Sequence, residues 1–453
     1  MNRREFIKTS GYGALALGLA GSTAGHAVSG NAARRRTQWS IKPKKWRSLG
    51  PLDLIPQLDR GQRWANESLI KYGTVEPPNG GSAGRCMRSA CMPAESCAHY
   101  YAMTGDPLTL KALEAAVKTF REYRNKARGR RVPYAGIDKP LKLDFEAMPE
   151  DRPTIEYEMI SCHVGRNMRG MRAAAHVLQD EQLLREVAEE LNWWIDNPLA
   201  FNREKHFFDA RVFVNENGKT VGSERKYTMN MGGSLACAMW LLGNDLGDKR
   251  LKDYAEDQIL NGIAPHQLDN GYFPYNIKHN YKLVDGIALD SNYYHALTLQ
   301  VISPLLAHKQ WSSNPEFAEM MRRGAKYIRD KLTRDTGVVK HPGHIDIIRF
   351  KKMNFCPKAP WGITADSALV HTRIYKYLGD EEALSQVARN LQWMHWNSPS
   401  CIPFLATDSH LGMEHIVSEW GFSHCFRQIM LVAWEGIHLK PRGLRDVEAV
   451  FIK

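Results

Sequence analysis

Side chains that transfer protons or hold anions recur at a few points in this sequence. His163, Arg166 and Asn167 have the spacing i, i+3 and i+4, so in a helix they share one face. A second group is the string Asp290-Ser291-Asn292-Tyr293-Tyr294-His295. Single residues of similar kinds lie in otherwise apolar segments: Tyr227, Asn230, Trp361, Asp366, Glu419 and His424.

This set of side chains favours one chemistry over another. Hydrolysis of a glycosidic bond needs two opposed carboxylates, whereas Tyr, His, Asn and Arg dominate here. Removing a proton from the carbon beside a carboxylate needs a group that neutralises the carboxylate, a base, and an acid for the leaving oxygen. We therefore expect Asn292, His163 and Arg166 to hold a substrate carboxylate and Tyr294 to exchange the proton.

The other candidates are expected to contact the substrate: Tyr293, His295, Tyr227, Asn230, Asn167, Trp361, Asp366, Glu419 and His424. Structural roles compete with these assignments. Asn292 is also a typical helix cap, and the two adjacent tyrosines are also typical core aromatics. Helical phase does not separate Tyr293 from Tyr294, and His163 also suits a hydrogen-bonded core position.

Five similar turns predict the elements that position these residues. They are centred on Asp106, Asp180, Asp248, Asn314 and Asp380, at spacings of 66 to 74 residues. Asp or Asn followed by Pro or Glu, as in four of the five, suits the N-cap of a helix. Each turn therefore starts a helix, such as 380–396, whose apolar residues follow i, i+3, i+4, i+7 spacing.

The helices before the turns are rich in small residues and read as buried on both sides. They begin near Ser89, Glu158, Asn230, Asn292, Thr364 and Ser418, and a first helix covers 52–71. Twelve helices in six hairpins close into a ring with one helix of each pair inside. The inner helices then start at one end of the ring, where the long connections at 127–157, 197–228, 263–290 and 333–363 form the walls of a cleft.

The hairpin pattern resembles the all-α (α/α)₆ toroid shared by many polysaccharide lyases, several glycoside hydrolases and the sugar epimerases. The string Asn292-Tyr293-Tyr294-His295 resembles the Asn/His/Tyr clusters of alginate and glucuronan lyases. The resemblance implies a lyase that cleaves an acidic, uronate-containing polysaccharide by β-elimination. Many lyases of this kind carry a C-terminal β-sandwich, but here only a short segment follows the last inner helix, so we expect one toroid domain over residues 51–453 with no C-terminal β-sandwich.

Three alternatives stay open. A glycoside hydrolase acting on unsaturated uronides would use Asp290, Asp366, Glu158 or Glu419. A sugar epimerase would work through pairs of histidines. A glycan-binding protein without activity would use the aromatic residues as stacking platforms only.

The N-terminus indicates an exported protein. Arg3 and Arg4 precede a short apolar run at 11–24 and a small-residue end at Ala27, which resembles a twin-arginine signal peptide over residues 1–27. A basic linker covers 28–50, and we expect a periplasmic protein. No later apolar run is long enough to span a membrane.

Composition narrows the partners. Lys and Arg number 61 against 49 Asp and Glu, for a net charge of +12, which favours a polyanionic partner. Export makes nucleic acid an improbable partner and leaves an acidic polysaccharide. Hydrophobic residues at 43% and charged residues at 24% are typical of a globular protein, which excludes disordered, collagenous and multi-span membrane classes.

We expect no cofactor and no metal. His341 and His344 could bind a metal in principle, but a loop in the cleft wall is favoured because no helix frames them. Among the eight cysteines, Cys86, Cys91 and Cys97 are close together and are expected to be small buried side chains. The sequence leaves the oligomeric state open.

Overall fold

A computed structural model describes most of the chain from Ile55 onward. The described residues are 55–75, 83–128, 137–138, 155–215, 220–277, 283–284, 287–288, 292–339, 360–396, 426–435, 438–440 and 450–452. All of them belong to one compact unit, Ser40–Lys453. The expected signal peptide at 1–27 and basic linker at 28–50 lie outside the described residues, so both stay predictions.

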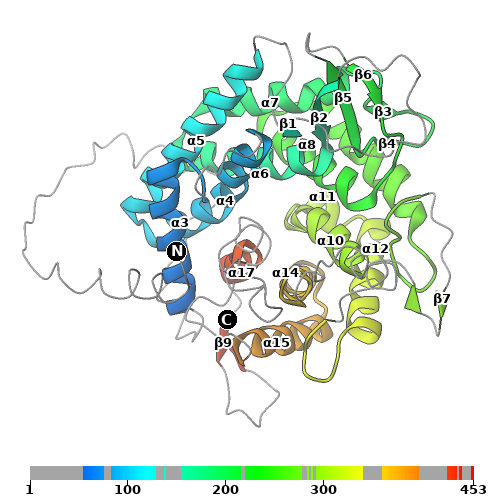
Figure 1. The fold of residues 1–453 in the computed structure, drawn as a ribbon. Coiled ribbons are helices and arrows are strands. Elements are labelled where there is room, and N and C mark those ends of the chain that lie inside the picture. The colour runs from blue at the N-terminus through cyan, green and yellow to red at the C-terminus, as the bar shows by residue number, and fades with distance from the viewer. Residues whose placement is uncertain are drawn as a thin grey trace, which may run out of the picture. The chain divides into compact units, whose positions relative to one another are not determined.

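Helices of the described residues form two concentric layers (Figure 1). The inner layer consists of α4 (Ala83–Thr104), α6 (Ser161–Leu178), α8 (Met229–Leu246), α10 (Asn292–Ile302), α14 (Pro360–Leu378) and α17 (Arg427–Trp434). Each inner helix packs against the next, and α17 packs against α4. The inner helices therefore close into a ring.

The outer layer surrounds this ring. It consists of α3 (Ile55–Tyr72), α5 (Pro107–Arg128), α7 (Glu181–Asp196), α9 (Lys249–Asp257), α12 (Pro315–Tyr327) and α15 (Glu381–Trp396). Short π-helical turns, η3 (Gln258–Ile263) and η6 (Ile328–Leu332), extend α9 and α12. The (α/α)₆ toroid predicted from the hairpin repeat is confirmed.

The repeat turns start the outer helices through capping hydrogen bonds. The Asp106, Asp180, Asp248, Asn314 and Asp380 side chains each accept at least one backbone N–H from the first turn that follows. Such caps satisfy N–H groups that have no partner within the helix. The five predicted turns are thus five N-caps.

Small residues let the inner helices pack closely. A Cβ atom added at Gly170 of α6 would lie 1.8 Å from the carbonyl oxygen of Cys91 in α4. One added at Gly165 would lie 2.4 Å from the backbone of Ser234 in α8. Because the backbones approach this closely, α6 is held on both sides and the polar side chains on its remaining face have fixed positions.

Buried ion pairs join the first and the last helix of the inner ring. Glu95 of α4 accepts from Arg169 of α6 at 2.6 Å and from Arg427 of α17 at 2.7 Å. All three side chains are buried. The two arginines hold the pKa of Glu95 at about 2 despite its burial. A charged carboxylate therefore links three inner helices.

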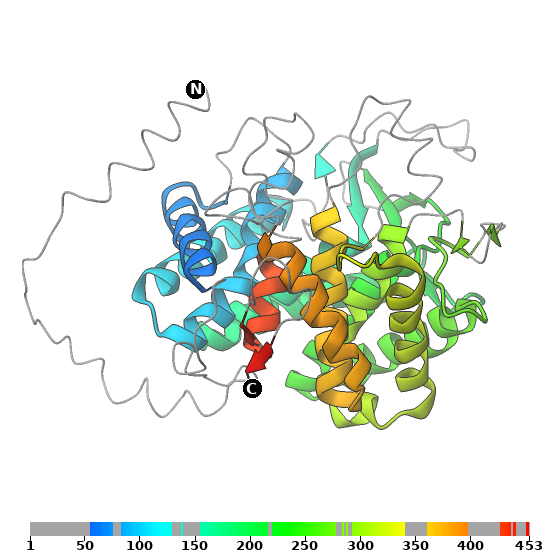
Figure 2. The ribbon, with the colours of Figure 1, turned by 90° about the horizontal axis from the view of Figure 1, so that it is seen from below.

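A small antiparallel sheet lies at the start of α6 and α8, at one end of the helices (Figure 2). Its strand order is β1 (Ile137–Asp138), β2 (Ile155–Ile160), β5 (Arg211–Asn215) and β6 (Thr220–Ser223). Strand β2 runs directly into α6. The sheet is built from two of the long connections expected to wall the cleft.

The remaining strands are two-residue or three-residue pairs. They are β3 (Phe201–Asn202) with β4 (Phe207–Phe208), β7 (Leu283–Val284) with β8 (Ile287–Ala288), and β9 (His438–Lys440) with β10 (Val450–Ile452). The described residues after α17 thus form only the β9–β10 pair, and no β-sandwich occurs among them. No helix of the described residues has the length and apolar character to cross a membrane.

Candidate active site

The site is built around the first turns of α6. Strand β2 ends at Ile160, and α6 begins at the next residue, so the sheet fixes where the helix starts. His163 lies in the first turn and is partly exposed, while Arg166 and Asn167 follow one turn later and are buried. The structure therefore brings these three residues together on one helix, as their spacing predicted.

Three arginines surround His163, and two of them come from other elements. Arg88 of α4 places its Nη1 atom 3.2 Å from His163 Nε2. Arg211 begins β5, and its partner across the ladder is Ile160 at the entrance to α6. Arg166 follows on α6 itself. An arginine has no acceptor, so Arg88 donates this bond and Nε2 carries the lone pair.

This environment keeps the imidazole neutral. Burial lowers the pKa of His163 well below its usual value, and the charges of Arg88, Arg166 and Arg211 lower it further. A neutral imidazole is a base, and the arginines around it favour an anion. The arrangement can therefore bind a negatively charged group beside a proton acceptor.

Buried amides without partners lie deeper in the ring. Within the described part of the chain, neither side-chain polar atom of Asn167 has a hydrogen-bond partner, and neither does Oδ1 of Asn230 on α8. Both residues are almost fully buried. An orphaned buried polar group costs about 1–3 kcal/mol, and such groups are most often explained by water or a functional role.

Two predicted tyrosines lie at the starts of the next two inner helices, α8 and α10. The hydroxyl of Tyr227, just before α8, accepts from Asn202 Nδ2 at 2.7 Å, and the side chain is largely buried. Tyr294 lies in the first turn of α10 and is half-buried. Its ring packs on that of Tyr275, with centroids 4.1 Å apart and planes at 34°.

His295 differs from its expected role as a substrate contact. It is fully buried, its Nδ1 accepts the backbone N–H of Phe273 at 2.9 Å, and its Nε2 lies 3.1 Å from the carbonyl oxygen of Gly324. Both ring nitrogens are therefore used to hold backbone segments. The competing role of a hydrogen-bonded core histidine, weighed for His163, applies to His295 instead.

Asp366 of α14 is also buried. Its Oδ1 accepts from Gln428 Nε2 of α17 at 2.7 Å, and the residue has no exposed surface. Asp366 thus joins two inner helices in the interior of the ring.

The remaining predicted residues are outside the described side chains. Asn292 and Tyr293 lie in the first turn of α10 and Trp361 lies in α14, but only their backbone is described. The same holds for Glu158 in β2. The residues Asp290, His341, His344, Glu419 and His424 lie outside the described residues altogether.

Sequence reasoning missed Arg88 and Arg211. Arg88 carried the same signal as Arg166, since both are arginines in helices of small buried residues. Arg211 carried none, because its place beside α6 depends on the pairing of β5 with β2. Among the described residues, no group of three metal-ligating side chains is present, and Cys91, Cys97, Cys162 and Cys237 are buried free thiols.

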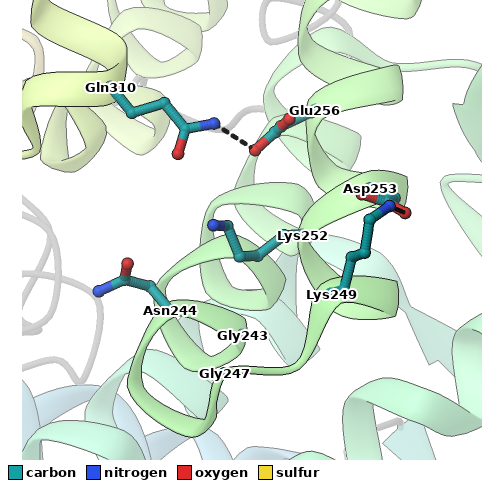
Figure 3. Close-up of a pocket in the computed structure, with 8 residues that line it drawn as sticks. All are labelled: Gly243, Asn244, Gly247, Lys249, Lys252, Asp253, Glu256 and Gln310. Carbon is teal, nitrogen blue, oxygen red and sulfur yellow. Dashed lines mark hydrogen bonds and ion pairs between the residues drawn. The ribbon is translucent and has the colours of Figure 1, made fainter.

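A separate pocket of about 350 Å³ lies at the other end of α8, between its C-terminus, α9 and Gln310 (Figure 3). Lys252 reaches between Asn244 and Gln310. Gln310 donates to Glu256 at 2.7 Å. None of the residues predicted to do chemistry lines this pocket, so we place the candidate site at the start of α6.

Comparison with solved structures shows related folds. The chain is similar to a D-mannose isomerase, with a TM-score of 0.55, 12% identity, and coverage of 83% of this chain and 96% of that one. It is also similar to a sugar epimerase from a ruminal bacterium, with a TM-score of 0.53, 13% identity, and coverage of 80% and 89%.

A third similar structure is the cellobiose 2-epimerase from Spirochaeta thermophila, with a TM-score of 0.52, 12% identity, and coverage of 85% and 98%. No family model and no curated protein matches the sequence. At these identities the likeness shows the toroid fold alone.

Proposed function

We propose that this chain is an enzyme that acts on an acidic carbohydrate and begins by removing the proton beside a uronate carboxylate. One observation carries the proposal: a neutral histidine with its Nε2 lone pair turned to Arg88, with Arg166 and Arg211 close by. A uronate supplies both the anion that the arginines favour and an acidic C–H bond beside it.

Substrate binding would prepare the base. Arg88 donates to His163 Nε2 in the free protein. A substrate carboxylate is a stronger acceptor than an imidazole, so it would draw Arg88 away and release the lone pair. Arg166 and Asn292 would complete the carboxylate site. The fixed positive charges would then stabilise the negative charge that develops as the proton leaves.

The reaction is β-elimination. His163 Nε2 accepts the proton from carbon 5 of the uronate, the electrons of that bond form a double bond between carbons 4 and 5, and the bond from carbon 4 to the glycosidic oxygen breaks. The Tyr294 hydroxyl gives its proton to the leaving oxygen, and solvent restores it. The product is an unsaturated uronate and a shortened chain. Alginate-like or glucuronan-like polymers are the substrates we propose.

A second candidate is epimerisation of a sugar acid. The fold similarity to a sugar epimerase and a cellobiose 2-epimerase favours it. The first step is the same, but a proton returns to the opposite face of carbon 5 and no bond to oxygen breaks. A hydrolase has less support, because Asp366, the one proposed catalytic carboxylate whose side chain is described, is buried and bonded to Gln428.

A panel of polyuronates separates these reactions. Elimination produces ultraviolet absorbance from the conjugated double bond together with new reducing ends. Hydrolysis produces reducing ends without absorbance, and epimerisation in D₂O incorporates deuterium at carbon 5 without either signal. Deuterium uptake alone would replace the lyase with the epimerase. Reducing ends alone, or no change in any polyuronate, would reject proton abstraction at this site.

A further inference from the structure

The basic residues around His163 continue along the same end of the ring. Arg211 Nε lies 3.4 Å from one carboxylate oxygen of Glu224, and Lys226 Nζ lies 3.7 Å from the other. One carboxylate therefore separates the two cations. Arg211 contributes to the His163 site, so Lys226 is linked to that site through Glu224.

An aromatic pair adjoins Lys226. Its ammonium lies 5.4 Å from the centre of the Tyr275 ring, and Tyr275 packs on Tyr294. All three side chains are half-buried, so each keeps part of its surface in solvent. A ring face next to a cation suits a ligand with an apolar face and a negative group, which describes a sugar acid.

The backbone holds these side chains in place. Lys226 N donates to the buried Asp209 carboxylate at 3.1 Å. Met229 N donates to the Tyr275 carbonyl at 3.1 Å, and Ile277 N donates to the Tyr227 carbonyl at 3.2 Å. The segments that carry Lys226 and Tyr275 are thus hydrogen-bonded to each other. Such preorganisation lowers the cost of ordering a site when a ligand binds.

We propose that Lys226 and Tyr275 form a second sugar subsite, which takes the uronate unit next to the unit at His163. Tyr275 provides the surface for the sugar ring, and Lys226 exchanges Glu224 for the carboxylate of that sugar. Tyr294, which lies against Tyr275, then stands between the two units at the leaving oxygen. The subsite selects chains of consecutive uronates, and its substrate class rests on the proposed function.

The test compares Lys226→Met with Lys71→Met. Lys71 makes the same kind of contact, 4.9 Å above the ring of Tyr72, but on the outer helix α3. With a polymer of consecutive uronates, Lys226→Met should raise KM about tenfold and change kcat little, because a charge-assisted bond is lost. Lys226→Arg should restore most of the affinity, and Lys71→Met should match the wild type.

A polymer in which uronates alternate with neutral sugars provides the second arm. There the Lys226→Met and wild-type proteins should have the same KM. An equal loss on both polymers, or no loss on either, would overturn the subsite. Binding of a saturated trimer of uronates, measured by calorimetry, tests the subsite even if no polyuronate is degraded. Trimer binding weakened by Lys226→Met without turnover would keep the subsite and reject the proposed reaction.

Discussion

At the scale of single residues, burial and then the charge of Arg88 keep His163 unprotonated. This charge lowers the pKa of the imidazole, so Arg88→Met should raise that pKa. A base works only when unprotonated, and the acid limb of the kcat profile should therefore move to higher pH. The wild-type profile should stay flat through pH 6.5, where an ordinary histidine gains its proton.

The matched control is Arg63→Met, because Arg63 is exposed on the outer helix α3. Its profile should equal that of the wild type. If the acid limb stays in place in Arg88→Met while kcat remains measurable, His163 is not the base.

The residues of the site were partly predictable. His163, Arg166 and Asn167 share one helix, and the i, i+3, i+4 rule needs no tertiary information. Arg211 was not predictable, because its place beside Ile160 depends on the pairing of two strands that are far apart in the sequence. The burial of His295 was not predictable either, since a string of polar residues at a helix start does not tell which side chain turns into the core.

At the scale of elements, the N-caps tie the hairpin repeat to stability. Asp248 accepts the N–H groups of Arg250 and Leu251 at the start of α9. Asp248→Ala should lower the free energy of unfolding by about 1 kcal/mol, measured by urea denaturation. Asp253→Ala serves as the control, because among the described residues Asp253 forms an exposed i, i+4 pair with Lys249 and does not cap the helix. An equal effect of both changes would mean that charge, not capping, matters there.

The helices were predictable and the sheet was not. Each of the five turns has a local sequence signal, which is a capping side chain after the end of a helix. These turns mark the hairpins, and the hairpins predict the ring. Strands β1, β2, β5 and β6 are short and lie in long connections, where alternation over two to six residues gives little signal. Since β2 and β5 place His163 and Arg211, the sheet that was not predicted explains why Arg211 was missed.

At the scale of the whole molecule, buried histidines should make the fold sensitive to acid. Burial lowers the pKa to about 4 in His99 and His371 and to about 3 in His295. Below the unfolded-state pKa near 6.5, these histidines bind protons in the unfolded chain but stay unprotonated in the folded chain. The free energy of unfolding should then fall by up to about 1.4 kcal/mol per pH unit for each histidine.

Urea denaturation between pH 6.5 and 4.5 measures this slope. Glu95, with its pKa at about 2, adds its own loss only below that window. Asp209 has the opposite effect on the free energy of unfolding, because burial raises its pKa to about 6. The size of this effect is about that of one buried histidine. His371→Gln should reduce this slope by the contribution of one histidine. A slope that His371→Gln leaves unchanged would contradict the assignment.

Export is the second prediction at this scale. We propose that the chain reaches the periplasm by the twin-arginine route, and changing Arg3 and Arg4 together to Lys should leave the precursor in the cytoplasm. Fractionation and immunoblotting measure this. Changing Arg34 and Arg35 to Lys, beyond the apolar run, should have no effect. Normal periplasmic appearance of the first variant would rule out this route.

The Glu95–Arg427 ion pair has a consequence for synthesis. Its two residues are 332 positions apart, so the ring closes only after the segment that carries Arg427 has left the ribosome. Until then Glu95 has only Arg169 as a partner, and the face of α4 that meets α17 is uncovered. Closure therefore depends on a contact between residues far apart in the sequence, which forms late in folding. A nascent chain of this protein therefore stays open, and accessible to chaperones and proteases, while the residues between Glu95 and Arg427 are synthesised.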